Sequence, residues 1–364
     1  MHPIPSPAKA CRNTAPDAGA RPSRRAAFAA DALLASALLV SVIQPVAAQS
    51  LVLDKRIELP SVQGRLDHLS IDVEGERLFV AALGADSVEV IDLRAGKRIA
   101  RLQPMHEPQG VVYMPESRRL FVANGAGGSV QAFADGKAPA AASADALDDA
   151  DNLRIRASEN HLFVGYAHAL AVVDTNTLRI IKRIELPGHP EGFEVERVGQ
   201  LIYLNVPSAK QIVVVDHHGG RITATWDIAG ASQNFPMTFD EPNHRLLVAT
   251  RRPPSLLVWD TATGKRVAEL PICGDADDLF FDSQRHQLYA ICGEGVVQVI
   301  RQRDADHYEV VERVATAPGA RTGLFVPALS TLYVAVPSRG GAAAEVPASS
   351  PSDSATPQTF KGPT

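Results

Sequence analysis

Side chains that could bind a positively charged ligand recur in this chain at one position of a repeated unit. The units begin with short apolar segments spaced roughly 40 to 44 residues apart. At the start of these segments, five units carry a carboxylate or an amide: Asp67, Gln109, Asp151, Glu191 and Asp277. The next position and the preceding loop add further polar side chains: His68, Asn152, His189, Asn234, Asp278 and Arg321. Carboxylates that face one narrow space raise each other's pKa unless a cation lies between them. We therefore predict a ligand site formed by these residues.

The ligand at such a site could be a metal ion. Carboxylate oxygens suit Ca²⁺ or Mg²⁺, and the histidines His68 and His189 would admit Zn²⁺ or another transition metal. Asp151, Glu191 and Asp277 are the hypothetical metal ligands. The sequence leaves two alternatives open, which are a metal-free site for a small organic ligand and a water-filled channel with a solvated polar rim.

Strands must position these side chains, because the repeated region shows no sustained helical period. Each unit continues with a second, strongly apolar segment, such as Leu78-Phe79-Val80 or Leu162-Phe163-Val164, and β-branched and aromatic residues are enriched throughout. Seven first strands can be counted, which predicts an all-β fold, a seven-bladed β-propeller over residues 49–340. The first strand of each blade lines the central channel, so equal repeat positions lie at equal height on its wall.

A duplicated hexapeptide indicates how the ring closes. Lys-Arg-Ile-Glu-Leu-Pro occurs at residues 55–60, with no unit before it, and again at residues 182–187, where it ends a unit. We therefore expect residues 51–59 to form the outer strand of the last blade, which leaves no sheet edge unpaired. Residues 344–346 are the expected third strand of that blade, within a low-complexity, disordered tail at residues 341–364. The second unit is expected to lack its fourth strand around residues 138–143.

The N-terminal residues 1–48 resemble a secretory signal peptide. Arg24 and Arg25 precede an apolar run, and small residues at Ala47 and Ala48 fit a cleavage site. We expect cleavage near Ala48, by the Sec or the twin-arginine route, and a periplasmic or secreted monomer without a membrane span. The net charge of −5 gives no basic face for nucleic acid.

Three further features have structural interpretations. Cys273 and Cys292 fall at the same end of one blade, where a disulfide and two free thiols are equally compatible with the sequence. The histidine pair at residues 217–218 is interpreted as part of a turn. Arg251 is placed beside the acidic residues, where a salt bridge with Asp275 or Asp277 is the simplest expectation.

The segments Leu78-Phe79-Val80-Ala81-Ala82, Ser87-Val88-Glu89-Val90-Ile91-Asp92 and Leu120-Phe121-Val122-Ala123-Asn124 resemble the YVTN repeat of YncE-like bacterial propellers. The resemblance covers about residues 51–339. It implies an exported seven-bladed propeller, and it transfers no catalytic residue. The wider superfamily includes lactonases and quinoprotein dehydrogenase subunits. The Trp-rich docking repeats of the latter are missing, because the chain has only two tryptophans.

Three functions follow from these observations. The favoured one is binding, without catalysis, of a small ligand, a metal ion or a protein partner at the acidic channel mouth. The alternative is a metal-dependent hydrolase similar to a lactonase, in which Glu191, Asp151 or Asp277 would hold the metal and His68 or His189 would move a proton. The third is a scaffold that uses its rim for protein contacts. The only cofactor that the sequence suggests is Ca²⁺ or another divalent metal. It does not identify a substrate.

Overall fold

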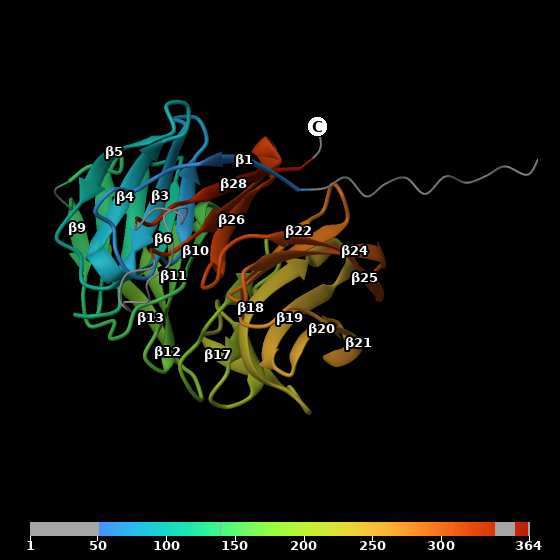
Figure 1. Ribbon diagram of the computed structural model, residues 1–364. Helices are drawn as coiled ribbons and strands as arrows, with labels where there is room; N and C mark the ends of the chain where they lie inside the picture. The colour runs from blue at the N-terminus through green and yellow to red at the C-terminus, as the bar shows by residue number, and fades with distance from the viewer. Residues whose placement is uncertain (1–50, 139, 339–353, 363–364) are drawn as a thin grey trace, which may run out of the picture. The chain divides into compact units, whose positions relative to one another are not determined.

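The computed structural model describes residues 51–138, 140–338 and 354–362, which form seven antiparallel sheets of four strands arranged as blades (Figure 1). Blades 1 to 3 consist of β2 (Leu69–Asp72), β3 (Arg77–Ala82), β4 (Ser87–Asp92) and β5 (Lys97–Leu102); β6 (Pro108–Met114), β7 (Arg119–Asn124), β8 (Ser129–Ala134) and β9 (Ala142–Ala144); and β10 (Leu153–Arg156), β11 (His161–Tyr166), β12 (Ala169–Asp174) and β13 (Ile180–Glu185). Blades 4 and 5 consist of β14 (Phe193–Val195), β15 (Leu201–Val206), β16 (Gln211–Asp216) and β17 (Arg221–Asp227); and β18 (Ser232–Asp240), β19 (Arg245–Arg252), β20 (Pro254–Asp260) and β21 (Lys265–Pro271). Blades 6 and 7 consist of β22 (Ala276–Asp282), β23 (Gln287–Cys292), β24 (Val296–Asp304) and β25 (His307–Ala315); and β26 (Thr322–Val326), β27 (Thr331–Ala335), β28 (Gln358–Lys361) and β1 (Val52–Arg56).

The seven-bladed propeller predicted from the repeat is therefore confirmed. Helical structure in the described part of the chain is limited to short 3₁₀ turns: η1 (Leu83–Ala85), η2 (Ala157–Glu159), η3 (Glu241–Asn243) and η4 (Pro327–Leu329). No helix among these residues is long and apolar enough to cross a membrane. The predicted signal peptide lies outside the described residues.

The hydrophobic core lies between neighbouring blades. The second and third strands carry nearly continuous apolar runs because both of their faces are covered by adjacent sheets. The fourth strands alternate, as β17 does, because one face meets solvent. Phe79 of blade 1 stacks on Tyr113 of blade 2 with ring centroids 5.4 Å apart, which illustrates how each interface is filled.

The ring closes through both ends of the described chain. As predicted, β1 is the outer strand of blade 7, and Leu53 pairs with Phe360 in the register of β1 with β28. Beyond β1, the amides of Ile57 and Leu59 donate to the carbonyls of Pro357 and Ala355, both at 2.9 Å. The two chain ends therefore support each other directly.

The third strand of blade 7 corrects the sequence prediction. It is β28, which lies within the segment expected to be a disordered tail, whereas the predicted strand at residues 344–346 lies outside the described residues. Phe360 is 1% exposed and packs with Tyr289 and Leu332. Gln358 and Thr359 are buried beside it, and β28 pairs with β27 on one side and β1 on the other, so this strand is ordered by contacts with segments distant in the sequence.

Blade 2 also differs from the prediction. Its fourth strand is present as β9, a short strand of small residues that pairs with β8 over Ala142, Ser143 and Ala144. The expected loss of this strand around residues 138–143 is therefore wrong, and the strand that forms there contains only alanine and serine. In blade 6, the sequence had left a disulfide and two free thiols equally open, and the structure contains the Cys273–Cys292 disulfide, with the two Cα atoms 5.9 Å apart.

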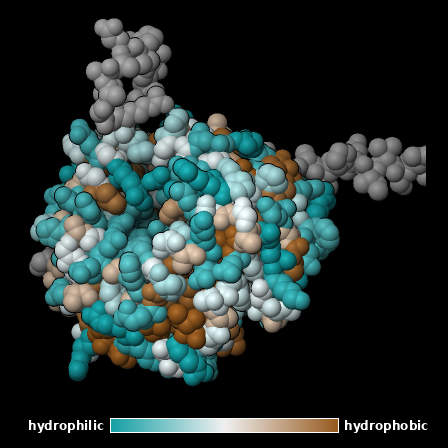
Figure 2. All heavy atoms as spheres, turned by 90° about the horizontal axis from the view of Figure 1, so that it is seen from below, coloured by the Kyte–Doolittle hydropathy of each residue, from teal (hydrophilic) through white to brown (hydrophobic). Residues whose placement is uncertain are grey.

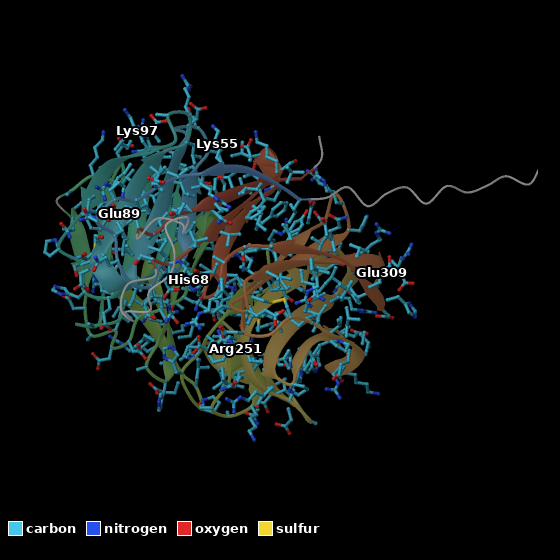
Figure 3. The ribbon with its side chains drawn as sticks, viewed as in Figure 1. Lys55, His68, Glu89, Lys97, Arg251 and Glu309 are labelled. Carbon is cyan, nitrogen blue, oxygen red and sulfur yellow. A yellow bond between two sulfur atoms is a disulfide. The ribbon has the colours of Figure 1, made fainter. Side chains whose placement is uncertain are left out.

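Charged side chains differ in their placement on the blades. Lys97 and Glu309 lie on outer strands, whereas His68 and Arg251 lie nearer the middle of the ring (Figure 3). The face seen in Figure 2 is mostly polar, with apolar side chains in small groups.

Candidate ligand site at the channel mouth

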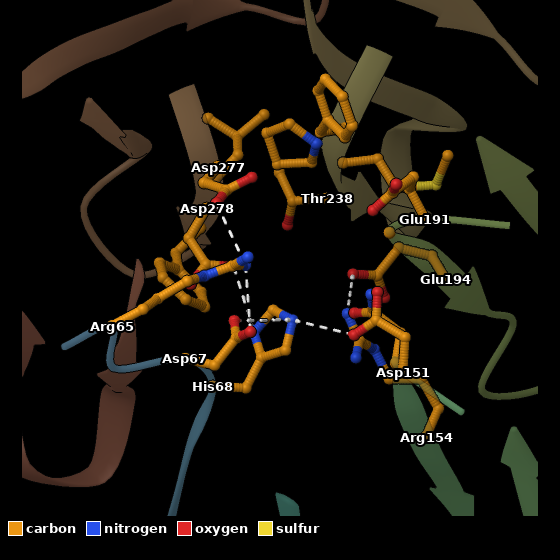
Figure 4. Close-up of a pocket in the computed structure, with 17 residues that line it drawn as sticks. Arg65, Asp67, His68, Asp151, Arg154, Glu191, Glu194, Thr238, Asp277 and Asp278 are labelled. Carbon is orange, nitrogen blue, oxygen red and sulfur yellow. Dashed lines mark ion pairs between the residues drawn. The ribbon is translucent and has the colours of Figure 1, made fainter. Parts of the chain in front are cut away.

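A small pocket lies where the first strands of five blades converge (Figure 4). Its water-accessible volume is about 80 Å³. This is room for a few water molecules, or for a ligand of a few non-hydrogen atoms. Seven residues predicted from the sequence line this pocket, which we call the channel mouth: Asp67, His68, Asp151, Asn152, Glu191, Asp277 and Asp278.

Equivalent backbone hydrogen bonds hold three of these residues at the same height. The amides of Asp67, Asp151 and Glu191 donate to the second-strand carbonyls of Ala81, Gly165 and Asn205, at 2.8, 2.9 and 2.9 Å. Each acidic side chain therefore extends from the residues that lead into a first strand. The repeat thus dictates the convergence, because one backbone arrangement is used in each of these blades.

His68 lies between carboxylates from three blades. Its Nε2 atom is 4.0 Å from an oxygen of Asp67 and 4.0 Å from an oxygen of Asp151, and its Nδ1 atom is 3.8 Å from Asp278. Burial lowers the pKa of the imidazole, but the charges of Asp278, Asp67 and Asp151 outweigh this effect, so its pKa is raised. His68, whose side chain is 22% exposed, is therefore surrounded by carboxyl groups that favour its protonated form.

Burial dominates the chemistry of the surrounding carboxyl groups. It raises the pKa of Asp278 to about 7 and that of Asp67 to about 6, although His68 acts against both shifts. Asp151 differs, because hydrogen bonding with His189 and the charge of His68 hold its pKa below the ordinary value despite burial. His189 approaches from the preceding loop, with Nε2 3.8 Å from Asp151.

Arginines neutralise one side of the channel mouth. Asp277 accepts a hydrogen bond from Arg251 at 2.6 Å and forms an ion pair with Arg321 at 2.9 Å. Arg65 contacts Asp67 at 3.0 Å. Arg251 also lies 3.1 Å from Asp275, so the expected salt bridge of this arginine is confirmed with both aspartates. The negative charge of Asp277 is thus balanced by arginines of the protein itself.

Glu191 occupies the other side without such a partner. Within the described residues, its carboxylate makes no hydrogen bond or ion pair at the distances that define these contacts. Burial, followed by repulsion from Asp151, raises its pKa to about 7. The pocket lining holds six carboxylates, namely Asp67, Asp151, Glu191, Glu194, Asp277 and Asp278, against the two guanidinium groups of Arg65 and Arg154. His68 also lines the pocket, and Arg251 and Arg321 pair with Asp277, so Glu191 is the carboxyl group of this lining that has neither an ion pair nor a hydrogen bond among the described residues.

The remaining predicted residues are placed differently. Gln109 lies outside the pocket lining, with its amide 3.5 Å from Asp149. Arg321 lies beside Asp277 at the rim. Asn234 is fully buried and donates to Asn205 at 2.9 Å, so it packs between blades 4 and 5 and does not face the pocket.

The hypothetical metal ligands do not form a coordination shell. Among the described residues, no ligand atoms of Asp151, Glu191 and Asp277 lie within 4.8 Å of one another as a group. Asp277 is held by arginines, and Asp151 is held by histidines. The acidic oxygens are therefore spread around the wall of the pocket and do not converge on one point.

Sequence reasoning missed Arg65, Arg154 and Glu194, all of which line the pocket. Arg154 and Glu194 each lie two residues after a pocket residue on the same strand path, so the two-residue alternation of a strand places them on the same face. That signal was available in the sequence. Arg65 lies in the loop before β2, where no periodicity applies.

The comparisons with known proteins support the fold. No family model and no curated protein matches the chain. Among solved structures, hydrazine synthase of Kuenenia stuttgartiensis is similar, with 17% sequence identity and a TM-score of 0.66 over 75% of this chain and 94% of that chain. At this identity the likeness concerns the fold alone. Membership of the YVTN family remains a prediction.

Proposed function

We propose that this protein binds a small organic cation, such as a primary amine, at the channel mouth, and that it does so without catalysing a reaction. The observation that supports this most is Glu191, a largely buried carboxylate that faces a pocket and makes no ion pair or hydrogen bond within the described chain, where only the more distant charges of His189 and His68 favour its ionised form. An ionised carboxylate in that position is costly unless a cation pairs with it. A bound cation would supply the missing charge.

The lining of the pocket favours an organic ligand. An ammonium group offers three donors to the oxygens around it, and charge-assisted hydrogen bonds of this kind are the strong ones. Phe280, Met237 and the Thr238 hydroxyl also line the space. These side chains suit a short aliphatic substituent better than they suit a bare ion.

The hydrolase alternative has less support. It places a metal on Glu191, Asp151 or Asp277, and two of these three candidate ligands are engaged by arginine or histidine. A hydrated divalent ion remains a distinct outcome of the test, because solvent could bridge the distances between the acidic oxygens.

The test measures thermal stability and binding heat for the mature chain with methylammonium, a series of longer primary amines, Ca²⁺, Mg²⁺ and Zn²⁺. We expect amines to raise the melting temperature of wild type, and expect Glu191→Gln to lose the effect. Glu116→Gln is the matched control, because Glu116 is exposed and distant from the pocket lining. Stabilisation by Ca²⁺ or Mg²⁺ alone would assign a metal in place of the amine, and indifference to every cation would reject the proposal.

We also propose that the protein is exported from the cytoplasm. The amine would be met outside the cytoplasm if residues 1–48 are removed during secretion. The predicted product begins at Gln49. Mass spectrometry of the protein from periplasmic and culture fractions tests this, and recovery of the intact chain from the cytoplasm alone would contradict it.

A further inference from the structure

A second cluster of ligand-type side chains lies far from the channel mouth, at the junction of blades 3 and 4. It comprises Glu159 at the end of η2, His161 at the start of β11, and His217 and His218 in the turn between β16 and β17. We call these four residues the His cluster. The turns between first and second strands, and those between third and fourth strands, lie on the opposite face of the ring from the loops that form the channel mouth. The two sites are therefore independent.

The distances within the His cluster match a coordination shell. One ligand atom from each of Glu159, His217 and His218 lies within 4.8 Å of the other two. The Glu159 carboxylate is 3.2 Å from Nε2 of His218, 3.9 Å from Nδ1 of His217 and 3.0 Å from Nδ1 of His161. With metal–ligand bonds of about 2.0 to 2.1 Å, tetrahedral ligand atoms lie about 3.3 Å apart. Small movements would bring Glu159, His217 and His218 onto one ion, and His161, which contacts Glu159, is the nearest candidate for a fourth ligand.

Unsatisfied buried atoms point into the same place. His217 is 2% exposed, and its Nδ1 atom has no hydrogen-bond partner among the described residues. The Glu159 Oε2 atom and the His161 Nδ1 atom are also buried and make no hydrogen bond there, but they lie 3.0 Å apart and form an ion pair when His161 is protonated. Buried polar atoms without partners are rare in folded proteins and call for an explanation. The unpartnered Nδ1 atom of His217, 3.9 Å from Oε2 of Glu159, is explained if a ligand normally lies between these two atoms.

The surrounding structure holds the cluster in place. Lys182 donates to the main-chain carbonyls of His217 and His218 at 3.1 and 2.7 Å, which fixes the turn. Phe163 packs edge-on against the His217 ring, with centroids 5.1 Å apart. The His218 side chain is 47% exposed, so an ion can enter from solvent. The ligands are therefore both preorganised and accessible.

Other blade junctions use a different residue at the same position. The second strands of blades 1, 2 and 5 begin with Arg77, Arg119 and Arg245, and each arginine bonds to the turn after the third strand of the next blade. Blade 3 has His161 there instead. The cluster is thus a feature of one junction, and the repeat itself does not require it.

Arg156 occupies the neighbourhood of the cluster in the structure. Its Nη1 atom is 2.8 Å from Nε2 of His217, and its Nε atom is 3.2 Å from Glu159. A guanidinium that donates to Nε2 places the imidazole proton on Nδ1, the atom that a metal would use. Metal binding therefore requires Arg156 to release His217. The arginine supplies the compensating positive charge when no metal is bound.

We infer that Glu159, His217 and His218, together with His161, bind a divalent transition-metal ion of the zinc type that links blades 3 and 4. Imidazole nitrogens and one carboxylate are ligands that Zn²⁺ accepts in a closed, tetrahedral site. Two ligands come from each blade, so the ion would act as a cross-link between them. This site is separate from the amine site proposed above, and neither depends on the other.

The test is a calorimetric titration of the full mature chain, free of any histidine tag and stripped with chelator, using Zn²⁺ as the probe. We expect one ion per chain in wild type and a loss of roughly tenfold or more in affinity for His218→Ala, which removes an exposed ligand. His244→Ala is the matched control, because this exposed histidine caps the corresponding turn η3 of blade 5. Glu191→Gln should bind the ion as wild type does, which excludes the channel mouth.

Two further measurements keep the inference falsifiable if a variant folds poorly. Arg156→Gln should bind Zn²⁺ more tightly than wild type, since it removes the competing cation and leaves every ligand in place. The absorption spectrum of the Co²⁺-loaded wild-type protein should show tetrahedral coordination. A wild type that binds no Zn²⁺, an affinity unchanged by His218→Ala, or a weaker Arg156→Gln would overturn the inference.

Discussion

Replacing Glu191 by glutamine should stabilise the ligand-free protein at neutral and alkaline pH. The pKa of this carboxyl is raised from 4.5 to about 7, first by burial and then by the charge of Asp151. Between these two pH values the folded state keeps a proton that the unfolded chain has lost, so stability falls as the pH rises from about 4.5 to about 7 and then levels off. At about 1.4 kcal/mol per pKa unit, a shift of about 2.5 units gives a loss of about 3.5 kcal/mol as an upper bound.

Glutamine has nearly the same volume and cannot ionise, so Glu191→Gln should not suffer this loss. At pH 8 with chelator and no ligand, we expect its melting temperature to exceed that of wild type by up to about 5 °C for a domain of this size. At pH 4 the two proteins should melt together. The assay is thermal unfolding followed by circular dichroism across this pH range, with Glu116→Gln as the control for removing one negative charge from the surface.

Two results would refute the reasoning. If Glu191→Gln and wild type melt alike at pH 8, the carboxylate is already compensated, and the argument for a missing cation fails. If the variant is less stable at every pH, Glu191 makes a structural contact that its lack of polar partners conceals. A stabilisation that grows from pH 4 to pH 8 is the expected pattern, because only a raised pKa produces it.

Three further predictions concern the ligand and the closure of the ring. Amine affinity should increase from pH 6 to pH 8, because the carboxyls of Glu191 and Asp278, with pKa values of about 7, must lose their protons to pair with a cation, and titration calorimetry at several pH values measures this. Phe360→Ala should destabilise the fold by about 3–5 kcal/mol in urea unfolding, because this side chain is 1% exposed and anchors β28 between β27 and β1. Replacing Cys273 and Cys292 together by alanine should cost about 3 kcal/mol, measured the same way, because the disulfide closes a loop of 19 residues.

The repeat made the architecture predictable, because each unit carries the same strand pattern. The duplicated hexapeptide also showed that the N-terminal segment at residues 55–60 corresponds to an outer strand, which had to belong to the last blade. The failure at β28 has a physical cause. Composition averages over a window, and a four-residue strand with one large apolar side chain, Phe360, is hidden among serine, proline and threonine. Its order depends on the open edge of β27, which lies far away in the sequence.

The channel mouth was predictable in outline because repeat position sets height on the wall. Its charge balance was not predictable in detail. Arg321 and Arg251 come from loops and strand ends, where no period tells which way a side chain points, and their pairing with Asp277 depends on contacts between blades. The His cluster shows the same limit. The turn at His217 was correctly interpreted as a turn, but Glu159 lies about sixty residues earlier and meets it only through the packing of two blades.

The seven blades have similar backbones, but the charged side chains at the channel mouth differ from blade to blade, so the two sides of the mouth are not equivalent. Arg65, Arg251 and Arg321 neutralise the acids contributed by blades 1 and 6, whereas Glu191 of blade 4 stays unpaired. A cation that enters the mouth would therefore be drawn to one side of the channel, although the backbone around it is nearly symmetric. The orientation of a bound amine would follow, with its charged end toward Glu191 and Asp151 and its substituent toward Phe280 and Met237. Because every blade has the same backbone arrangement, the specificity of such a site depends on the few side chains that differ between equivalent positions of the repeat.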